Sequence, residues 1–401
     1  MSRDDALCGT PWYECYSSTI GRSDAHESDV DSIHIYDVNR QNRMVFRPEG
    51  IADELHAWRN RYDIAWYKDR CRNVMPSYSV GVFSSGGCLD TLAAIRASFT
   101  PLWGSECCPI KSKMWEDLTA TPSYPDTFKH DWSSVNKVTL LKSGQTCIDY
   151  SLSGPYFRGE PGGRDEATGW MFTAQMDSIL TIRPKAFVLE MVSSATRVHD
   201  GSEVDEVVSR LSEFYHVHKE DNFRVWTQGD VSNRSRMFIV GFDREHVGQE
   251  GARFQFPKPT FDDRRFPIAL DVCIPDDDVP EAYIINDTPF MLKWKDPKPG
   301  LLHKLAKSGE SMGLSSHPNS VYSWLSLFNT TTTYGGGGRF PMLSYQYDGS
   351  QIDKTRKITP IEAVRVASLP ESYATWARMF GEEESFQSDS HLLECVASVR
   401  V

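Results

Sequence analysis

The strongest constraint on the fold is an alternation of short apolar runs and amphipathic stretches that begins at Tyr78. The run Ser79–Phe83 leads into a turn with two glycines, and apolar residues then recur at helical spacing over residues 89–98. Repeated strand–turn–helix units are typical of a parallel, doubly wound sheet. We therefore predict an α/β fold with a mostly parallel sheet. The predicted strands are 79–83, 101–106, 138–141, 186–189 and 236–241, and the predicted helices are 89–98, 171–182 and 203–214.

The rest of the chain divides by composition. Residues 1–77 are polar and irregular apart from a helical stretch at 51–67, which predicts an N-terminal extension docked on the main domain. Residues 78–241 form the main α/β domain. Residues 242–354 are rich in Pro, Asp and Gly and have weak periodicity, so we predict a small inserted domain. Residues 355–401 return to the main domain, beginning with an amphipathic helix at 356–367.

Composition narrows the function classes. With 40% hydrophobic residues in 401, the chain can bury a sizeable core. A net charge of −12 argues against a protein that coats nucleic acid non-specifically. The first residues resemble no signal peptide and no long apolar run occurs, which predicts an intracellular protein without a membrane segment. The nine cysteines show no CxxC and no zinc-ligand spacing, so we expect reduced thiols and no metal.

Several chemistry-bearing residues follow the predicted strands. The turn after the first strand, residues 83–90 (FSSGGCLD), lets a ligand approach the backbone at a helix N-terminus. Glu106 ends the next strand, where a carboxylate can bind a ribose diol, and Asp131 is placed similarly after the third. Cys147 lies in a turn after an apolar run, where a thiol is available as a nucleophile. Taken singly, each residue has an ordinary structural interpretation.

Their order along the chain resembles the cytosine-5 DNA methyltransferase family. Residues 83–90 are similar to that family's cofactor turn (FSGxGGLD), and residues 146–151 (TCIDYS) to its nucleophile loop (PCQxFS). Residues 190–192 (EMV) resemble its ENV, residues 232–236 (SNRSR) its QxRxR, and residues 356–373 its conserved late helix and turn.

The resemblance implies a Rossmann-like class I methyltransferase fold with S-adenosylmethionine as cofactor. Residues 78–241 would be the catalytic domain and residues 242–354 the target-recognition domain. Cys147 would attack carbon 6 of a cytosine flipped out of double-stranded DNA, with Glu190 acting as the acid at ring nitrogen 3. Arg234 and Arg236 would hold the base. The implied cofactor-site residues are Phe83, Ser84, Gly86, Gly87, Leu89, Glu106 and Asp131. We expect a monomer, in the nucleus of a eukaryote or the cytoplasm of a bacterium or a phage host.

Some supporting positions depart from the family pattern. Thr146 stands where the family has proline, Ile148 and Ser232 where it has glutamine, and Met191 where it has asparagine. The last family motif, GNxVPP, is not recognisable. Two alternatives therefore stay open. One is a methyltransferase acting on RNA or tRNA cytosine, or another cytosine-5 modifier; the other is a weakly active or inactive family member that binds nucleic acid or regulates a partner.

Overall fold

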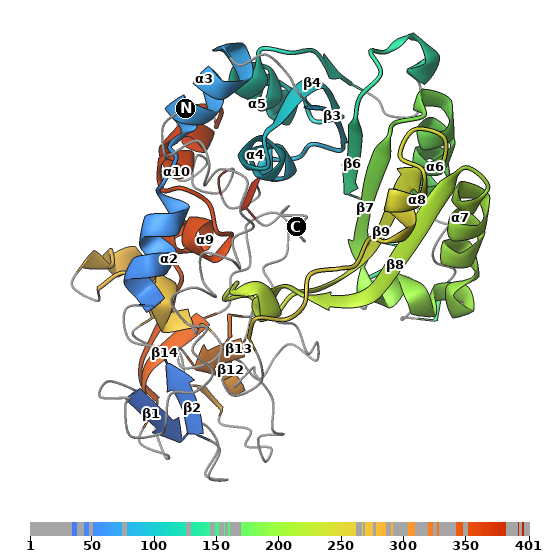
Figure 1. Cartoon of the computed structure of the whole chain (residues 1–401). Coiled ribbons are helices and arrows are strands. Elements are labelled where there is room, and N and C mark those ends of the chain that lie inside the picture. Colours follow the sequence, from blue (N-terminus) through green and yellow to red (C-terminus); the bar gives the residue numbers. More distant parts are fainter. Residues whose placement is uncertain are drawn as a thin grey trace, which may run out of the picture.

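The computed structural model describes residues 34–37, 44–47, 51–73, 78–125, 130–144, 149–151, 156, 159–160, 170–261, 267, 269–275, 278–285, 290–291, 304–308, 320–323, 327–328, 342–347, 352–381, 392 and 395–396. A seven-stranded sheet with the order β5-β4-β3-β6-β7-β9-β8 is its centre (Figure 1). Its strands are β3 (Tyr78–Phe83), β4 (Phe99–Ser105), β5 (Ser123–Tyr124), β6 (Leu140–Gly144), β7 (Ala186–Val192), β8 (Tyr215–Arg224) and β9 (Ser235–Asp243).

The sheet is mostly parallel, as predicted. The strands β5, β4, β3, β6 and β7 run parallel, whereas β9 is antiparallel to both β7 and β8. Chain order reverses direction across the sheet between β3 and β6, because β4 and β5 lie on one side of β3 and β6 and β7 on the other. In an open α/β sheet, such a switch point is where the carboxyl ends of the strands form a ligand crevice.

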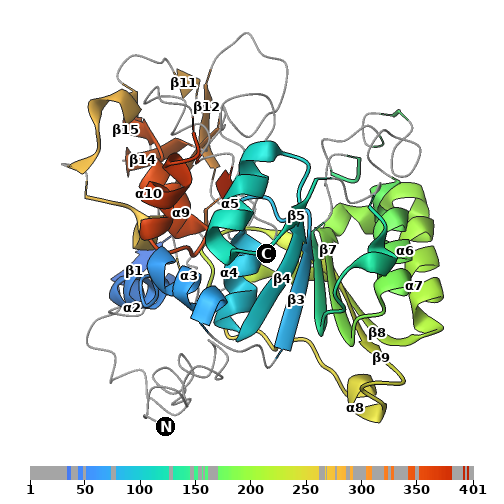
Figure 2. The same ribbon diagram turned by 90° about the horizontal axis from the view of Figure 1, so that it is seen from above.

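Helices cover both faces of this sheet (Figure 2). Neighbouring residues of a strand point to opposite faces, so Leu140 and Leu141 of β6 join different hydrophobic clusters. One cluster includes apolar residues of α4 (Leu89–Arg96) and α5 (Pro109–Thr119). The other includes those of α6 (Met171–Ile182) and α7 (Ser202–Ser212). This three-layer arrangement confirms the predicted doubly wound fold.

The stretch predicted as one helix at 51–67 is two helices, α2 (Ile51–Arg59) and α3 (Ile64–Asn73). They lie next to the C-terminal helices α9 (Pro360–Val366) and α10 (Ser372–Arg378) (Figure 1). The Ile64 amide donates to Ser372 Oγ at 3.0 Å, and Asn60 Oδ1 accepts from the Glu371 amide at 2.8 Å. The described part of the N-terminal segment is thus bound to the far end of the chain.

The helix predicted from residue 356 begins later. Residues Arg356 and Lys357 end the strand β15 (Ile352–Lys357), and Thr359 caps α9, with Pro360 in its first turn. The Thr359 side chain accepts from the Glu362 amide while the Glu362 carboxylate accepts from the Thr359 amide, which fixes the helix start. The prediction was wrong because hydrophobic spacing continued through this cap.

A second sheet of six strands, with the order β10-β15-β14-β13-β12-β11, lies within residues 284–357. Its remaining strands are β10 (Ile284–Ile285), β11 (Phe290–Met291), β12 (Lys304–Ser308), β13 (Ser320–Ser323) and β14 (Met342–Tyr347). The short helix α8 (Gln249–Ala252) follows β9, and β1 (His34–Asp37) pairs with β2 (Met44–Arg47). Among the described residues, no helix is long and apolar enough to cross a bilayer.

Candidate active site

The turn between β3 and α4 has an unusual backbone. Ser84, Gly86 and Cys88 have φ values of 51°, 51° and 67°, all in the left-handed region. The Ser85 amide donates to the Ser105 carbonyl at 3.0 Å, and the Cys88 amide to the Ser85 carbonyl at 2.9 Å. These bonds hold a tight turn directly at the N-terminus of α4, where backbone N–H groups and the helix dipole favour a polar ligand.

Glu106 connects this turn to the end of β4. Its Oε2 accepts from the Gly86 amide at 2.8 Å and its Oε1 from the Cys108 amide at 3.0 Å. The side chain is buried, so the carboxylate is held in one position beside the switch point between β3 and β6. The sequence argument placed a carboxylate at this strand end, and the structure brings it onto the glycine turn.

Aromatic rings form one wall of the same region. The Phe83 ring at the end of β3 meets the Trp132 ring edge-on at 4.6 Å between centroids, and Trp103 lies against both. Asp131 caps the short 3₁₀ helix Trp132–Ser134 and is exposed. Hydrogen bonds from the Ser133 hydroxyl and amide lower the pKa of Asp131. Asp131 therefore lies beside an aromatic residue that contacts the end of β3.

Gly87 and Leu89 connect the turn to α10 and to the core. The Tyr373 hydroxyl of α10 donates to the Gly87 carbonyl at 2.7 Å. A Cβ at Gly87 would lie 2.6 Å from that hydroxyl, so only glycine allows this approach. Leu89 is the first residue of α4 and is buried in the core. The helix α10 therefore packs directly against the turn at Gly87.

A buried ion pair lies under the same helix. Lys142 of β6 places its Nζ 3.3 Å from Asp90 Oδ1 in the first turn of α4, and both side chains are nearly inaccessible to solvent. Sequence reasoning did not single out Lys142, and it included Asp90 only as the last residue of the turn at 83–90. The available signal was a lysine inside an otherwise apolar run, Leu140–Ser143, of a central strand.

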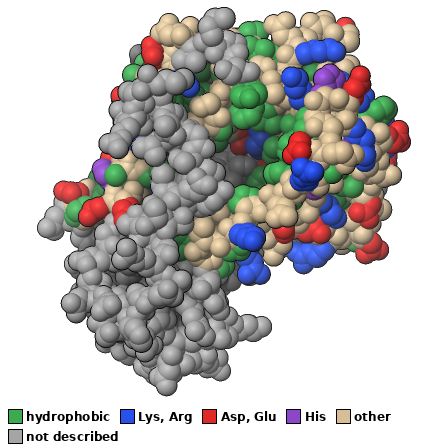
Figure 3. All heavy atoms as spheres, in the orientation of Figure 1, with side chains coloured by type: hydrophobic (Ala, Val, Ile, Leu, Met, Phe, Trp, Pro, Cys, Tyr) green, Lys and Arg blue, Asp and Glu red, His purple; other side chains and the backbone are tan. Residues whose placement is uncertain are grey.

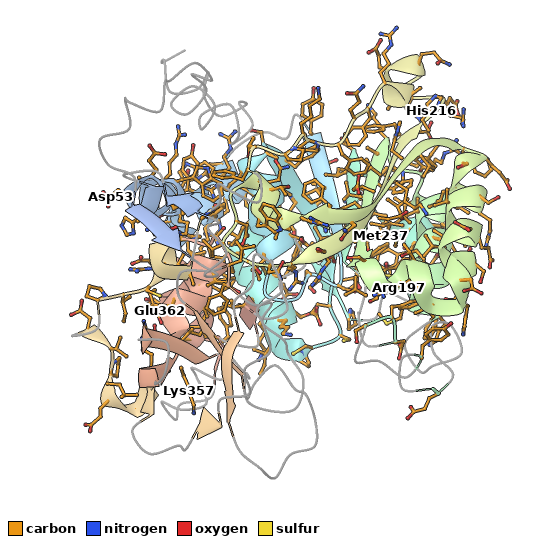
Figure 4. All side chains as sticks on the ribbon, turned by 90° about the horizontal axis from the view of Figure 1, so that it is seen from below. Asp53, Arg197, His216, Met237, Lys357 and Glu362 are labelled. Carbon is orange, nitrogen blue, oxygen red and sulfur yellow. The ribbon has the colours of Figure 1, made fainter. Side chains whose placement is uncertain are left out.

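Glu190 and Arg236 meet on adjacent strands. Glu190 lies in β7 and is 2% exposed, and Arg236 at the start of β9 places its Nε 2.6 Å from Glu190 Oε1. The antiparallel register sets Val192 opposite Arg236, which brings the two charged side chains to one end of the strand pair. Figure 4 labels the neighbouring residue Met237 within this sheet.

Arg234 is also buried and lies in a segment with several supports. The Asn233 amide donates to the Phe328 carbonyl at 2.7 Å, and the Phe328 amide donates to the Val231 carbonyl at 2.7 Å. Burial raises the pKa of Asp230 to about 6, although the Ser232 amide and the Arg234 and Arg59 guanidinium groups lower it in part. These contacts connect residues 230–234 with Arg59 at the end of α2 and with residues 327–328.

Cys147 lies outside the described residues. The strand that leads to it is described, and its last residue, Gly144, is paired with Glu190 in the parallel register of β6 and β7. Asp149 and Tyr150, on the far side of the loop, are buried. The described residues on both sides of 145–148 are thus buried, and the last of them before this segment, Gly144, lies beside Glu190 of β7.

The face shown in Figure 3 has a hollow near its centre, where acidic and basic side chains are visible among hydrophobic ones. Elsewhere among the described residues of that face, Lys and Arg side chains are interspersed with Asp and Glu. In Figure 4, Arg197, in the segment after β7, lies with the seven-stranded sheet and its helices, whereas Glu362 of α9 and Lys357 at the end of β15 lie together on the other side of the molecule.

The comparisons with known proteins agree with this arrangement. The family model described as C-5 cytosine-specific DNA methylase matches residues 82–379, which is most of the chain. The chain belongs to the C-5 cytosine-specific DNA methylase family. That match includes the glycine turn, Glu106, Glu190 and both arginines within a single span.

Curated relatives in this methylase family are bacterial. The chain is 29% identical over 281 residues to the type II methyltransferase M1.ScrFI of Lactococcus lactis subsp. cremoris, which covers 68% of this chain and 64% of that enzyme. It is 25% identical over 278 residues to M.HhaI of Haemophilus parahaemolyticus, covering 67% and 79%. The match to M1.ScrFI therefore spans less than two thirds of that enzyme's length.

Solved structures with the same fold include eukaryotic members. Spodoptera frugiperda DNMT2 superposes with a TM-score of 0.52 at 12% identity, covering 80% of this chain and 97% of that one. The Entamoeba histolytica methyltransferase EhMeth gives a TM-score of 0.51 at 12% identity, with coverages of 81% and 94%. These likenesses establish the methylase family's fold for this chain.

One group of side chains in the described part of the molecule has metal-ligand types close together, namely Asp243, Glu245 and His246. Asp243 Oδ1 accepts from the Glu245 and His246 amides at 2.9 and 3.0 Å, and its Oδ2 accepts from Arg183 Nε. These hydrogen bonds lower the pKa of Asp243 to about 2 against the effect of its burial. The group therefore serves as the turn that ends β9.

Proposed function

We propose that this chain transfers a methyl group to carbon 5 of cytosine in DNA, using S-adenosylmethionine and a transient covalent bond to Cys147. One observation carries the proposal. The strand leading to Cys147 is paired at Gly144 with Glu190, and Glu190 is in turn held by Arg236 at 2.6 Å. The last described residue before the proposed nucleophile loop, the proposed acid and one of the two arginines thus lie at one end of β7, next to the switch point of the sheet, and this supports the proposal.

The residues around the glycine turn fit the proposed cofactor. Its left-handed backbone keeps the turn tight at the start of α4, and the buried Glu106 carboxylate stands where a ribose diol is bound in sheets of this class. Trp132, which packs edge-on against the fully buried Phe83, supplies an apolar surface for an adenine ring. Bound there, S-adenosylmethionine supplies the methyl group to carbon 5. Asp131, beside that wall, is the candidate partner for the base's polar edge.

The remaining chemistry belongs to the chain's own side chains. Carbon 5 of cytosine is a weak nucleophile, so the Cys147 thiolate first forms a bond to carbon 6 and moves electron density to carbon 5. Glu190 hydrogen-bonds ring nitrogen 3 and stabilises the charge that develops there. Arg234 and Arg236 orient Glu190 and the base carbonyl. Transfer of the carbon 5 proton to water then lets the Cys147 thiolate leave carbon 6, which restores the ring.

This reaction requires the base to leave the duplex, because carbon 6 is inaccessible within stacked pairs. We therefore propose double-stranded DNA with a flipped cytosine as substrate and residues 242–354 as the target-recognition region. We further propose a monomer as the active form.

The deciding experiment is covalent trapping on DNA that contains 5-fluorocytosine, with S-adenosylmethionine present. Fluorine at carbon 5 blocks the final elimination, so a denaturant-stable adduct should form with the wild type. Cys147→Ser should give none, and Glu190→Gln should slow adduct formation by about 10²–10⁴-fold. An adduct on RNA alone would move the substrate to RNA. Cofactor binding without any adduct would favour a binding or regulatory protein.

A further inference from the structure

The nucleophile loop is attached to the rest of the molecule by a tyrosine. The Tyr150 hydroxyl donates to Glu203 Oε2 at 2.6 Å, and both side chains are buried. Glu203 lies in the first turn of α7, where the helix dipole favours a carboxylate. The family motif PCQxFS has phenylalanine at this position, which lacks the hydroxyl. The hydrogen bond is therefore a feature of this chain's own loop.

The same carboxylate has a second partner. His199 Nδ1 lies 2.9 Å from Glu203 Oε1, so the two oxygens of Glu203 serve different segments. The His199 ring also meets the Tyr156 ring edge-on at 5.3 Å between centroids. Tyr156 follows Tyr150 by six residues, so the described residues after Cys147 meet this cluster at two points.

His199 lies in a strained segment that follows β7, the strand that carries the proposed acid Glu190. His199 and Asp200 have φ values of 48° and 56°, which are unfavourable for residues with a Cβ. The segment Ser193–Gly201 begins immediately after β7, the strand that carries Glu190. Within it, the Ser194 hydroxyl donates to the Tyr150 carbonyl at 2.6 Å in a buried contact. Such strain persists only where surrounding contacts hold it.

We propose that Tyr150, Glu203 and His199 position the nucleophile loop relative to the acid strand for the reaction. The inference rests on the proposed function, and it adds positioning residues that act through Cys147 and Glu190 rather than on the base. Two buried bonds, one to the Tyr150 side chain and one to its carbonyl, tie the loop to both α7 and the segment after Glu190. They supply support at a loop where Thr146 and Ile148 replace the family's proline and glutamine.

The test compares Tyr150→Phe with Tyr215→Phe in the full chain. Tyr215 is a matched control, because it is also buried and its hydroxyl donates to the Pro184 carbonyl at 3.1 Å. It lies at the opposite end of the sheet from Glu190, since it pairs with Asp243 of β9. We would measure the rate constant for adduct formation on 5-fluorocytosine DNA at saturation, together with KM for DNA and for S-adenosylmethionine.

Tyr150→Phe should lower the rate constant about tenfold or more, because misplacing a reacting group costs rate rather than affinity. Both KM values should stay within about twofold of the wild type. Tyr215→Phe should leave the rate constant unchanged. Glu203→Gln, which keeps an acceptor, should lose less than Glu203→Ala. In the Glu203→Ala background, Tyr150→Phe should cause no further loss.

A second readout is independent of turnover. Amide hydrogen exchange in the peptide spanning residues 144–151 should accelerate in Tyr150→Phe and not in Tyr215→Phe. A wild-type rate of adduct formation in Tyr150→Phe would overturn the inference, as would an equal loss in Tyr215→Phe. If the wild type itself forms no adduct, the proposed function fails. In that case amide hydrogen exchange in residues 144–151 is the only test. Faster exchange in Tyr150→Phe alone supports the inference, and unchanged exchange overturns it.

Discussion

Replacing Arg236 with methionine should destabilise the sheet strongly. Its Nε lies 2.6 Å from Glu190 Oε1, and the side chains of Arg236 and Glu190 are only 10% and 2% exposed. Methionine fills similar volume but leaves the Glu190 carboxylate buried without its cation. Breaking a buried pair in this way costs about 3–5 kcal/mol. At about 2–4 °C per kcal/mol for a domain of this size, the thermal midpoint should fall by roughly 6–20 °C.

The matched control is Arg210→Met. Arg210 and Asp177 form an ion pair with the same kind of geometry, Nη2 to Oδ1 at 2.9 Å, but their side chains are 42% and 55% exposed. Exposed pairs contribute about 0–1 kcal/mol, so the midpoint should fall by less than about 4 °C. Differential scanning fluorimetry at constant pH and salt would measure both variants against the wild type.

A third variant separates lost charge pairing from lost packing. Combining Arg236→Met with Glu190→Gln removes the isolated carboxylate, and the double variant should be more stable than Arg236→Met alone. The argument fails if Arg236→Met unfolds within about 4 °C of the wild type, or if Glu190→Gln makes Arg236→Met less stable. Either result would mean that the carboxylate at this strand end does not depend on Arg236.

Three further outcomes follow from other buried groups. Burial raises the pKa of Asp230 to about 6, so its stabilising contribution is present at low pH and is lost as pH rises through 6. The stability of Asp230→Asn relative to the wild type, followed by thermal unfolding, should therefore rise by at most about 3 kcal/mol between pH 4 and 7.5. The same dependence of stability on pH in both proteins would contradict this. Arg356 contacts both oxygens of Glu362 at 2.6 Å, so Arg356→Met should cost about 3–5 kcal/mol, partly recovered by adding Glu362→Gln. In calorimetric titration with S-adenosylmethionine, Gly87→Ala should bind about tenfold more weakly because its Cβ meets Tyr373 Oη; adding Tyr373→Phe should restore part of the affinity, and unchanged binding would refute the clash.

Strands with apolar sequences could be predicted because burial dictates their composition. The run 186–189 and the helix 171–182 were found in this way, the helix with its bounds intact. The strand β8 was missed, since Tyr215–Arg224 is an edge strand with a polar sequence that carries little hydrophobic signal. The helix start at Thr359 was missed because the capping pair Thr359 and Glu362 is a weaker signal in the sequence than the apolar spacing that continues on both sides of it.

In the candidate site, too, some residues could be predicted from the sequence and others could not. Residues at strand ends, such as Glu106 and Glu190, could be proposed because parallel strands bring their carboxyl ends to one edge. The partners of these residues could not. Tyr150 and Glu203 are separated by 53 positions, and nothing in either local pattern specifies their contact. Lys142 gave a signal, a charge inside an apolar strand, but its partner in α4 becomes evident only from the packing.

This division explains how the proposed reacting residues can keep their places while the residues around them differ from the family pattern. The register of β6 and β7 sets Gly144 beside Glu190 through backbone hydrogen bonds, which residues other than proline can form whatever their side chain. The bracing of the loop depends instead on side chains, and side-chain contacts can be exchanged if another buried polar pair fixes the same backbone. Tyr150 with Glu203 and Ser194 forms such a set of contacts. Divergence should therefore collect at loop-bracing positions and be rare where the strand register itself places a reacting group.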